Sequence, residues 1–158
     1  MIIKQWNNER PDLDVTSMAL IGRLKHLHQH LGNGMGKTFA AHDLNPASFD
    51  VLATLRRHGK PYALSPNELL ATMMVTSGTM TNRIDQLVKV GLVERIANPN
   101  DGRSFIISLT EPGLALIDKT VTAHVATQTH LTSGLSADEQ QALNQLLIKF
   151  LASLEQET

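Results

Sequence analysis

The chain contains no cysteine among its 158 residues, which excludes disulfide bonds, thiolate zinc sites and cysteine nucleophiles. Aromatic residues make up only 4% of the sequence, so we expect a core built mainly from aliphatic side chains and methionine. No apolar run approaches the ~20 residues that a membrane-spanning helix needs, and residues 1–14 lack the apolar stretch of a signal peptide. These absences favour a soluble, cytoplasmic protein of one domain.

The net charge of −1 hides an uneven distribution of charge along the chain. Residues 55–103 carry seven positive and four negative side chains, whereas the two ends of the chain are acidic on balance. A basic middle between acidic ends is typical of a protein that places one lobe on phosphate groups. A bias of this size also arises by chance, so the charge pattern alone does not decide the function.

The spacing of apolar residues predicts a long helix over about residues 12–42. Gly32, Gly34 and Gly36 interrupt it, and we expect them to kink the helix or to allow close packing. Asn45-Pro46 is a typical helix start, because asparagine caps the first turn and proline fits the first helical position. That second helix is predicted to end near Arg57.

A helix-turn-helix followed by a wing is predicted for the middle of the chain. Ser65-Pro66-Asn67-Glu68 forms a capping box that opens a short helix, and Thr76 is predicted to cap a second helix that ends before Gly91. The β-rich runs 92–97 and 104–109 are joined by Asn, Pro, Asp and Gly, which predicts a hairpin.

The remaining sequence predicts two further helices, over about residues 111–130 and 137–154. Their apolar positions exceed what one lobe can cover, which indicates an intertwined homodimer. We therefore predict a mainly α fold with a small β-hairpin wing, in a single domain that spans residues 1–158. A winged helix-turn-helix DNA-binding lobe would cover about residues 45–110, and dimerisation helices would cover about residues 12–42 and 111–156.

A recognition helix places its N-terminal half in the major groove, where small polar side chains meet bases and phosphates. An arginine at the wing can enter the minor groove, and a nearby aspartate can restrain it. An ordinary capped surface helix explains the same polar residues without DNA. The predicted DNA-binding set is Ser65, Thr76, Ser77, Thr79, Met80, Thr81, Asn82, Asp101 and Arg103.

The central motifs resemble the MarR family of winged-helix transcription regulators. The matching stretches, in order, are Leu64-Ser65-Pro66, Glu68-Leu69-Leu70, Thr79-Met80-Thr81, Ile84-Asp85, Gly91-Leu92-Val93-Glu94-Arg95, Asp101-Gly102-Arg103 and Leu109-Thr110. The resemblance implies a homodimer on a pseudo-palindromic double-stranded DNA operator, usually as a repressor. It also implies release from DNA by a small-molecule effector.

A narrower resemblance is to the urate-responsive (PecS-like and HucR-like) branch of this family, and it rests on Trp6, Asp50, Arg83 and Arg95. It implies that these four residues bind urate or a related anionic aromatic compound. A tryptophan face and arginine forks suit a planar anion, and Asp50 is expected to pair with Arg95. The long N-terminal helix of some members is not expected here. Each residue also has an alternative role. Trp6 would pack at the dimer interface, Asp50 and Arg95 would form a structural ion pair, and Arg83 would bind a DNA phosphate.

Other functions stay open at this point. The effector alternatives are phenolic or lipophilic compounds, and a winged-helix protein-interaction module is possible because Asn82 stands where many family members carry arginine. No serine-histidine-aspartate motif or phosphate loop indicates an enzyme, so no catalytic residue is predicted. His26 and His30 share a helix face, but no acidic residue completes a metal site in that run. We interpret His26, His28 and His30 as a solvated or dimer-seam face, and we predict no metal or cofactor.

Overall fold

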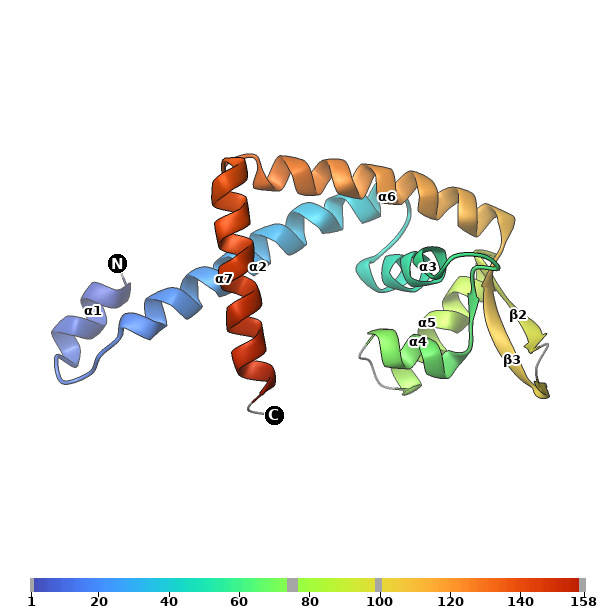
Figure 1. Cartoon of the computed structure of the whole chain (residues 1–158), viewed down its shortest axis with the longest axis horizontal. Helices are drawn as coiled ribbons and strands as arrows, with labels where there is room; N and C mark the ends of the chain where they lie inside the picture. The colour runs from blue at the N-terminus through green and yellow to red at the C-terminus, as the bar shows by residue number, and fades with distance from the viewer. Residues whose placement is uncertain (1, 74–76, 99–100, 157–158) are drawn as a thin grey trace.

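The computed structural model describes residues 2–73, 77–98 and 101–156, which form one winged lobe and a set of extended helical arms (Figure 1). The winged lobe lies at one end, and helices α1, α2 and α7 extend away from it. The elements are, in order, α1 Ile2–Glu9, α2 Thr16–Ala40, α3 Pro46–His58, β1 Ala63–Leu64, α4 Pro66–Met73, α5 Ser77–Lys89, β2 Val93–Asn98, β3 Asp101–Leu109, α6 Glu111–Thr132 and α7 Ala137–Glu155.

Polar caps set the beginnings of three helices where the sequence predicted them. The Asn45 side chain accepts a hydrogen bond from the Ser48 backbone N–H at the start of α3. Ser136 and Glu139 form a complete capping box at α7, and Thr110 accepts from the Gly113 backbone N–H at α6. These predicted helix starts are confirmed, because each cap satisfies backbone donors that have no partner inside the helix.

The three strands form one antiparallel sheet in the order β1-β3-β2. Val93 pairs with Leu109 and Arg95 pairs with Ile107, so the predicted hairpin is confirmed. Its second strand begins at Asp101 rather than at Ser104, because residues of the expected turn already pair across the ladder. The register is interrupted between Ala97 and Asn98 by an irregularity near the tip of the wing.

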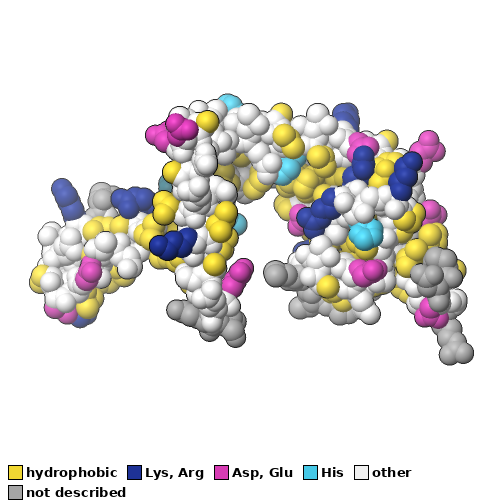
Figure 2. All heavy atoms as spheres, viewed as in Figure 1, with side chains coloured by type: hydrophobic (Ala, Val, Ile, Leu, Met, Phe, Trp, Pro, Cys, Tyr) yellow, Lys and Arg dark blue, Asp and Glu magenta, His cyan; other side chains and the backbone are white. Residues whose placement is uncertain are grey.

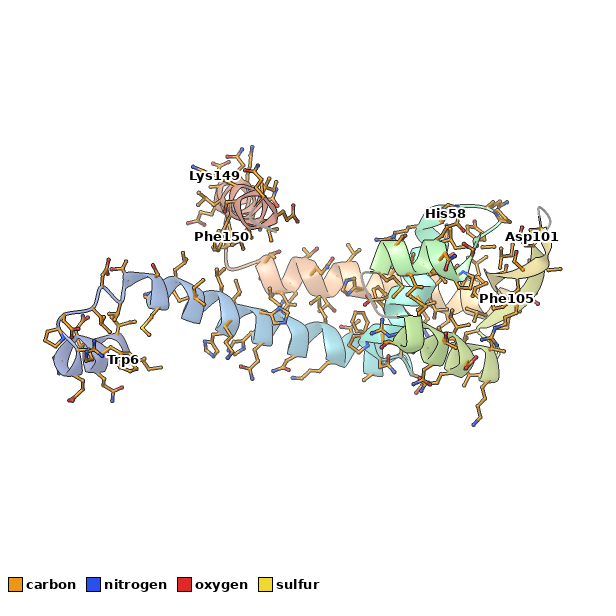
Figure 3. The ribbon with its side chains drawn as sticks, turned by 90° about the horizontal axis from the view of Figure 1, so that it is seen from below. Trp6, His58, Asp101, Phe105, Lys149 and Phe150 are labelled. Atoms are coloured by element: carbon orange, nitrogen blue, oxygen red, sulfur yellow. The ribbon has the colours of Figure 1, made fainter. Side chains whose placement is uncertain are left out.

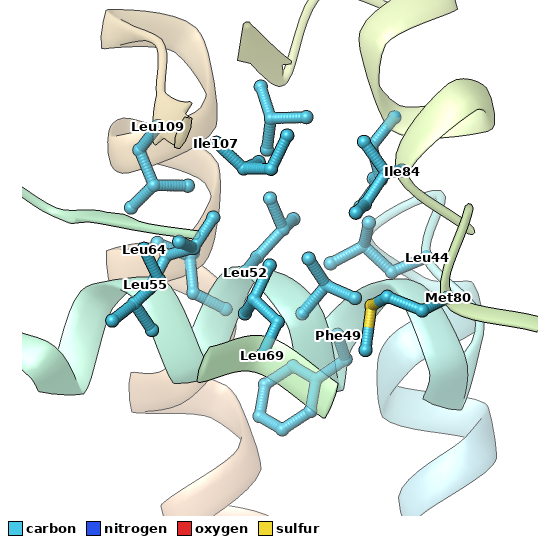
Figure 4. Close-up of a cluster of buried hydrophobic side chains, with 14 of the residues drawn as sticks. Leu44, Phe49, Leu52, Leu55, Leu64, Leu69, Met80, Ile84, Ile107 and Leu109 are labelled. Atoms are coloured by element: carbon cyan, nitrogen blue, oxygen red, sulfur yellow. The ribbon is translucent and has the colours of Figure 1, made fainter. Parts of the chain in front are cut away.

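The hydrophobic core lies almost entirely within the winged lobe (Figure 4). Leu52 and Leu55 of α3 are fully buried, and they pack with Leu69 of α4 and Ile107 of β3. Ile117 connects the beginning of α6 to the same cluster. Each side chain of this size stabilises the fold by about 1.5–3 kcal/mol on full burial, so the lobe has a substantial core of its own.

The helical arms correct three predictions. The long first helix begins at Thr16 rather than at Asp12, and a separate helix over residues 2–9 precedes it although no N-terminal helix was expected. The glycine run does not interrupt α2, which continues to Ala40. A Cβ on Gly34 would lie 3.0 Å from the Leu131 side chain, so close packing of α2 on α6 is the role of that glycine. Among the described residues, no helix is long and apolar enough to cross a membrane.

Candidate nucleic-acid interface and ligand site

Helices α4 and α5 form a helix-turn-helix whose second helix is fixed by its inner face. Met80, Ile84 and Leu87 lie on that face, and each is at most 2% exposed. Their spacing of four and three residues places them on one stripe of the helix. Thr79 and Asn82 lie on the exposed side of α5. The helix is therefore held rigidly while it presents polar side chains to solvent.

Met80 is a correction to the predicted DNA-binding set. Its side chain is 1% exposed and belongs to the core cluster of the winged lobe, so it does not reach the surface of α5. The polar residues on either side of Met80 concealed the helical period, which places it one turn before Ile84. Thr79, Thr81 and Asn82 are exposed, and their contact with DNA stays a prediction.

Ser65 has a structural role at the start of α4. Its backbone N–H and its hydroxyl both donate to Glu68 Oε2 at 2.7 Å, and its Oγ accepts from the Glu68 backbone N–H at 3.3 Å. These hydrogen bonds favour the charged carboxylate and lower the pKa of Glu68 below its ordinary value. The capping box is confirmed, and contact of Ser65 with DNA stays a prediction.

The wing carries the other predicted DNA contacts. Asp101 lies exposed at the first position of β3. Asn98 Nδ2 donates to Ser104 Oγ at 3.0 Å and connects the two strands near the tip. Ser104 Oγ donates to the Asp101 backbone oxygen at 3.1 Å within β3. Thr76 and the side chains of Ser77 and Arg103 lie outside the described part of the structure, and their roles stay predictions.

Arg95 does not pair with Asp50, which corrects that prediction. Its guanidinium contacts the Asp85 carboxylate of α5 and lies 5.4 Å from the centre of the Phe105 ring. The reason is topological, because β2 follows α5 after a tight turn at Gly91, whose φ of 73° suits glycine. The ion pair therefore links the wing to the recognition helix.

Asp50 lies on α3 close to several positive charges. Partial burial raises the pKa of Asp50 above its ordinary value, whereas the charges of Arg83, Arg57 and His124 oppose that rise. Arg83 belongs to α5, so the structure brings two of the four predicted ligand residues into one electrostatic neighbourhood. Positive charges around this position would also favour a bound anion.

His124 is a candidate ligand residue that the sequence reasoning missed. Its ring lies 5.1 Å from the ring of Phe39 and 4.9 Å from that of Phe49, where α2, α3 and α6 meet. Its Nδ1 is buried and has no hydrogen-bond partner among the described residues. Burial lowers the pKa of His124, while the charge of Asp50 opposes that shift. The only sequence signal was its position one turn after Thr120, on the inner face of α6.

Trp6 lies far from the other predicted ligand residues of the same chain. Figure 3 shows it at the end of the molecule opposite the winged lobe, in α1. Its side chain is 42% exposed and lines a shallow groove of about 300 Å³ with Ile2, Gln5 and Glu9. Trp6 therefore does not reach Asp50 or Arg83 within one copy of the chain.

Comparisons with known proteins agree with this architecture. Residues 42–104 match a family model described as the MarR family. The chain is 40% identical over 146 residues to the HTH-type transcriptional regulator PecS of Dickeya dadantii, and the alignment covers 92% of this chain and 88% of PecS.

Two solved structures add information about partners. A mutant of MarR from Escherichia coli in complex with operator DNA is 31% identical, with a TM-score of 0.73 over 92% of this chain and 97% of that one. BpsR of Bordetella bronchiseptica is 26% identical, with a TM-score of 0.70 over 82% of this chain and 90% of that one. The DNA binding of BpsR is regulated by 6-hydroxynicotinic acid.

Proposed function

The chain belongs to the MarR family of DNA-binding transcriptional regulators, and we propose that it is a homodimeric repressor released from its operator by a small anionic aromatic compound such as urate. One observation carries the ligand part of this proposal. Arg83 lies on the recognition helix α5, and its positive charge lowers the pKa of Asp50 on α3, against the rise caused by burial. A ligand that binds Arg83 therefore acts directly on the element that reads DNA.

The proposed DNA contact uses the exposed half of α5. The N-terminal half of a recognition helix enters the major groove, where hydroxyl and amide side chains bond phosphates and base edges. Thr79, Thr81 and Asn82 occupy that half and are exposed. The wing would place Arg103 at the adjacent minor groove, with Asp101 beside it. Figure 2 shows several basic side chains on the same lobe, with acidic side chains among them.

The proposed homodimer would cover the apolar faces of the helical arms. Helix α7 stands apart from α2 and α6 in Figure 3, and apolar side chains lie along its surface in Figure 2. Exposed apolar patches of this extent mark interfaces in soluble proteins. The large exposed apolar residues of α2 and α7 are Met18, Leu20, Ile21, Leu27, Leu143, Leu146, Ile148, Leu151 and Leu154.

The proposed ligand site lies between α3, α5 and α6. Arg83 would donate two parallel hydrogen bonds to the anionic edge of the ligand. Asp50 would accept hydrogen bonds from the N–H groups of the ligand. The ring would stack on Trp6, which a second copy of the chain would supply because Trp6 lies at the far end of its own chain. Arg95 would join the set by exchanging its pair with Asp85 for the ligand.

Release from DNA would follow from competition between charges. The ligand and Asp50 compete for Arg83, and the ligand and Asp85 compete for Arg95. Both exchanges change how α5 is held, so the two recognition helices of a dimer would no longer match successive major grooves. A coupling free energy of only ~1–3 kcal/mol changes operator occupancy by about 5–150-fold. Regulation of BpsR by 6-hydroxynicotinic acid supports a small aromatic acid as the ligand class.

The ligand is tested by the fluorescence of Trp6, the one tryptophan of the chain. The protein is titrated with urate, xanthine and salicylate, and the readings are corrected for absorption by the ligand. We expect saturable quenching by urate that is lost in Arg83→Ala. Saturation by salicylate alone would move the effector to the phenolic class. Unchanged fluorescence with all three compounds would remove the ligand part of the proposal.

The DNA part is tested by the salt dependence of binding to DNA from upstream of the protein's own gene. Neutralisation of phosphates releases counterions, so the logarithm of the binding constant should fall steeply and linearly with the logarithm of salt concentration. Scrambled DNA of the same composition is the control for sequence preference. A flat salt response without sequence preference would instead favour a protein-interaction module.

A further inference from the structure

Two histidines on the exposed surface of α2 face one another at close range. His26 and His30 lie one helical turn apart, and their Nε2 atoms are 3.1 Å from each other. The ring centres are 4.5 Å apart, and the ring planes meet at 69°. The two nitrogens are within hydrogen-bond distance of each other beside the helix, outside both sites described above, so one nitrogen donates and the other accepts. A metal ion that binds both nitrogens would replace the proton that they share.

Packing does not explain this pair. Both rings are exposed and neither belongs to the core cluster, in contrast to His124, which packs against Phe39 and Phe49. His42 has a different role, because its Nδ1 lies 2.9 Å from the Thr38 backbone oxygen. Within the described residues, the contact between His26 and His30 is the one interaction that either ring makes.

The spacing of the two nitrogens suits a shared metal ion. With a metal–nitrogen distance of about 2.0–2.1 Å, two nitrogens 3.1 Å apart subtend an angle of about 100° at the ion. That angle lies between the right angle of square-planar or octahedral neighbours and the wider angle of a tetrahedral site. Imidazole is a preferred ligand of zinc, copper and nickel, and all three use these geometries.

We propose that His26 and His30 together bind one divalent transition-metal ion, with water at its remaining positions. Among the described residues, no group of three or more histidine, cysteine, aspartate or glutamate side chains is arranged to hold a metal. The site is therefore a two-ligand chelate that binds more weakly than a structural zinc site. By the usual order of affinities, Cu²⁺ binds more tightly than Zn²⁺ or Ni²⁺.

The position of the pair gives the ion a local structural effect. The chelate joins consecutive turns of α2 just before Gly32, Gly34 and Gly36, and each glycine weakens a helix relative to alanine. A bound ion holds both side chains in their helical arrangement, so it stabilises the turn that precedes this glycine run. Metal binding consequently favours the folded form of α2.

The test uses the full chain without any affinity tag. Zn²⁺ is titrated calorimetrically into the wild type, His26→Ala, His30→Ala and the double variant. His28→Ala is the matched control, because His28 lies between the pair on another side of α2. All three positions are exposed and alanine favours helix, so the fold should persist, which circular dichroism checks.

We expect one ion per chain, an affinity at least about tenfold lower in each single variant of the pair, and no change in His28→Ala. With one equivalent of Cu²⁺, electron paramagnetic resonance should show two coupled imidazole nitrogens in the wild type and one in His30→Ala. Binding by the double variant that equals the wild type would overturn the proposal. A loss in His28→Ala as large as in His30→Ala would also overturn it.

Discussion

The winged lobe buries its large apolar side chains, whereas the helical arms leave theirs exposed. In the lobe, Leu52, Leu55 and Leu69 are fully buried in a shared core. In the arms, α1 and α7 contain no buried residue in the described structure, and α2 contains only Phe39. Leu146 and Leu151 of α7 are 65% and 57% exposed.

This contrast separates the part of the molecule whose core is complete within one chain from the part that the proposed dimer would cover. The core of the lobe is complete within one chain, whereas the arms expose leucine and isoleucine at helical spacing. The junction where Phe39, Phe49 and His124 meet is the place where one lobe can influence the other. Substitutions in the lobe, in the arms and at the junction should therefore have distinguishable effects.

The largest effect is expected from Leu52→Ala in the core of the winged lobe. Leu52 is 0% exposed, so its truncation removes buried apolar surface and leaves a cavity. We expect the free energy of unfolding to fall by about 2–5 kcal/mol, measured by urea denaturation at a fixed protein concentration. Leu146→Ala on the exposed face of α7 is the control for the same change in an arm. A cost in the core below that in the arm would contradict the contrast between the two regions.

A charge on the exposed face of α7 should affect assembly and leave the lobe intact. In Leu151→Asp, the carboxylate would be buried at the proposed dimer interface. We expect dimer dissociation to become easier by about a hundredfold, or ~2.7 kcal/mol, in analytical ultracentrifugation. Operator binding should weaken with it. Lys149→Ala on the same helix is the control, and a dimer unaffected by Leu151→Asp would place the interface elsewhere.

Within the lobe, Arg103→Ala should separate DNA binding from ligand binding. Loss of a proposed minor-groove contact is expected to weaken operator binding about tenfold, or ~1.4 kcal/mol, and to reduce the salt slope. Calorimetry with urate should give an unchanged affinity, because Arg103 is not in the proposed ligand site. An equal loss of both activities would show that the two sites are not separate.

Asp50→Asn, in the proposed ligand site, should weaken the effect of the ligand on DNA binding. The neutral amide does not hold Arg83 as the carboxylate does, so binding of urate to Arg83 no longer displaces a charged partner. We therefore expect ligand-induced release to be reduced, with the urate concentration that releases operator DNA rising by about fivefold. The dimer and its thermal midpoint should persist, which ultracentrifugation and calorimetry check. Release at the wild-type urate concentration would remove Asp50 from the mechanism.

The smallest effect is a pH dependence at His124. Burial lowers the pKa of His124 in the folded chain, so the unfolded chain binds more protons at pH values between the folded and unfolded pKa. Stability therefore rises with pH through that window and is lost as the pH falls below the unfolded value of about 6.5. His124→Phe keeps an aromatic ring beside Phe39 and Phe49 and should reduce this slope. Thermal midpoints of both forms from about pH 5 to about pH 8 test the prediction, and parallel curves would contradict it.

The caps and turns of the winged lobe were predictable because they depend on neighbours in the sequence. Ser65 and Glu68 satisfy each other across a single turn, and Gly91 ends α5 by its own backbone freedom. The short helix at residues 2–9 was missed because it has no polar cap or buried face to indicate it. The start of β3 was missed because pairing with β2 extends the strand into residues typical of a turn.

The candidate sites were only partly predictable. The sequence grouped Trp6, Asp50, Arg83 and Arg95, and the structure brings only Asp50 and Arg83 near one another in one chain. Arg95 pairs with Asp85 because β2 follows directly after α5, whereas Asp50 lies on α3. Met80 turned inward because the helical period, rather than its polar neighbours, decides the face of a side chain.

The sequence by itself determined the order of the helices from α2 onward, the helix caps, the hairpin and the membership of this chain in its family. These features follow from local hydrogen bonds and from periodicity, which act over a few residues. Only the tertiary structure decided the partner of Arg95, the burial of Met80 and the placement of His124 beside two phenylalanines. Those outcomes depend on how helices and strands pack, because side chains far apart in sequence, or free to rotate, meet only when the packed backbone fixes their positions.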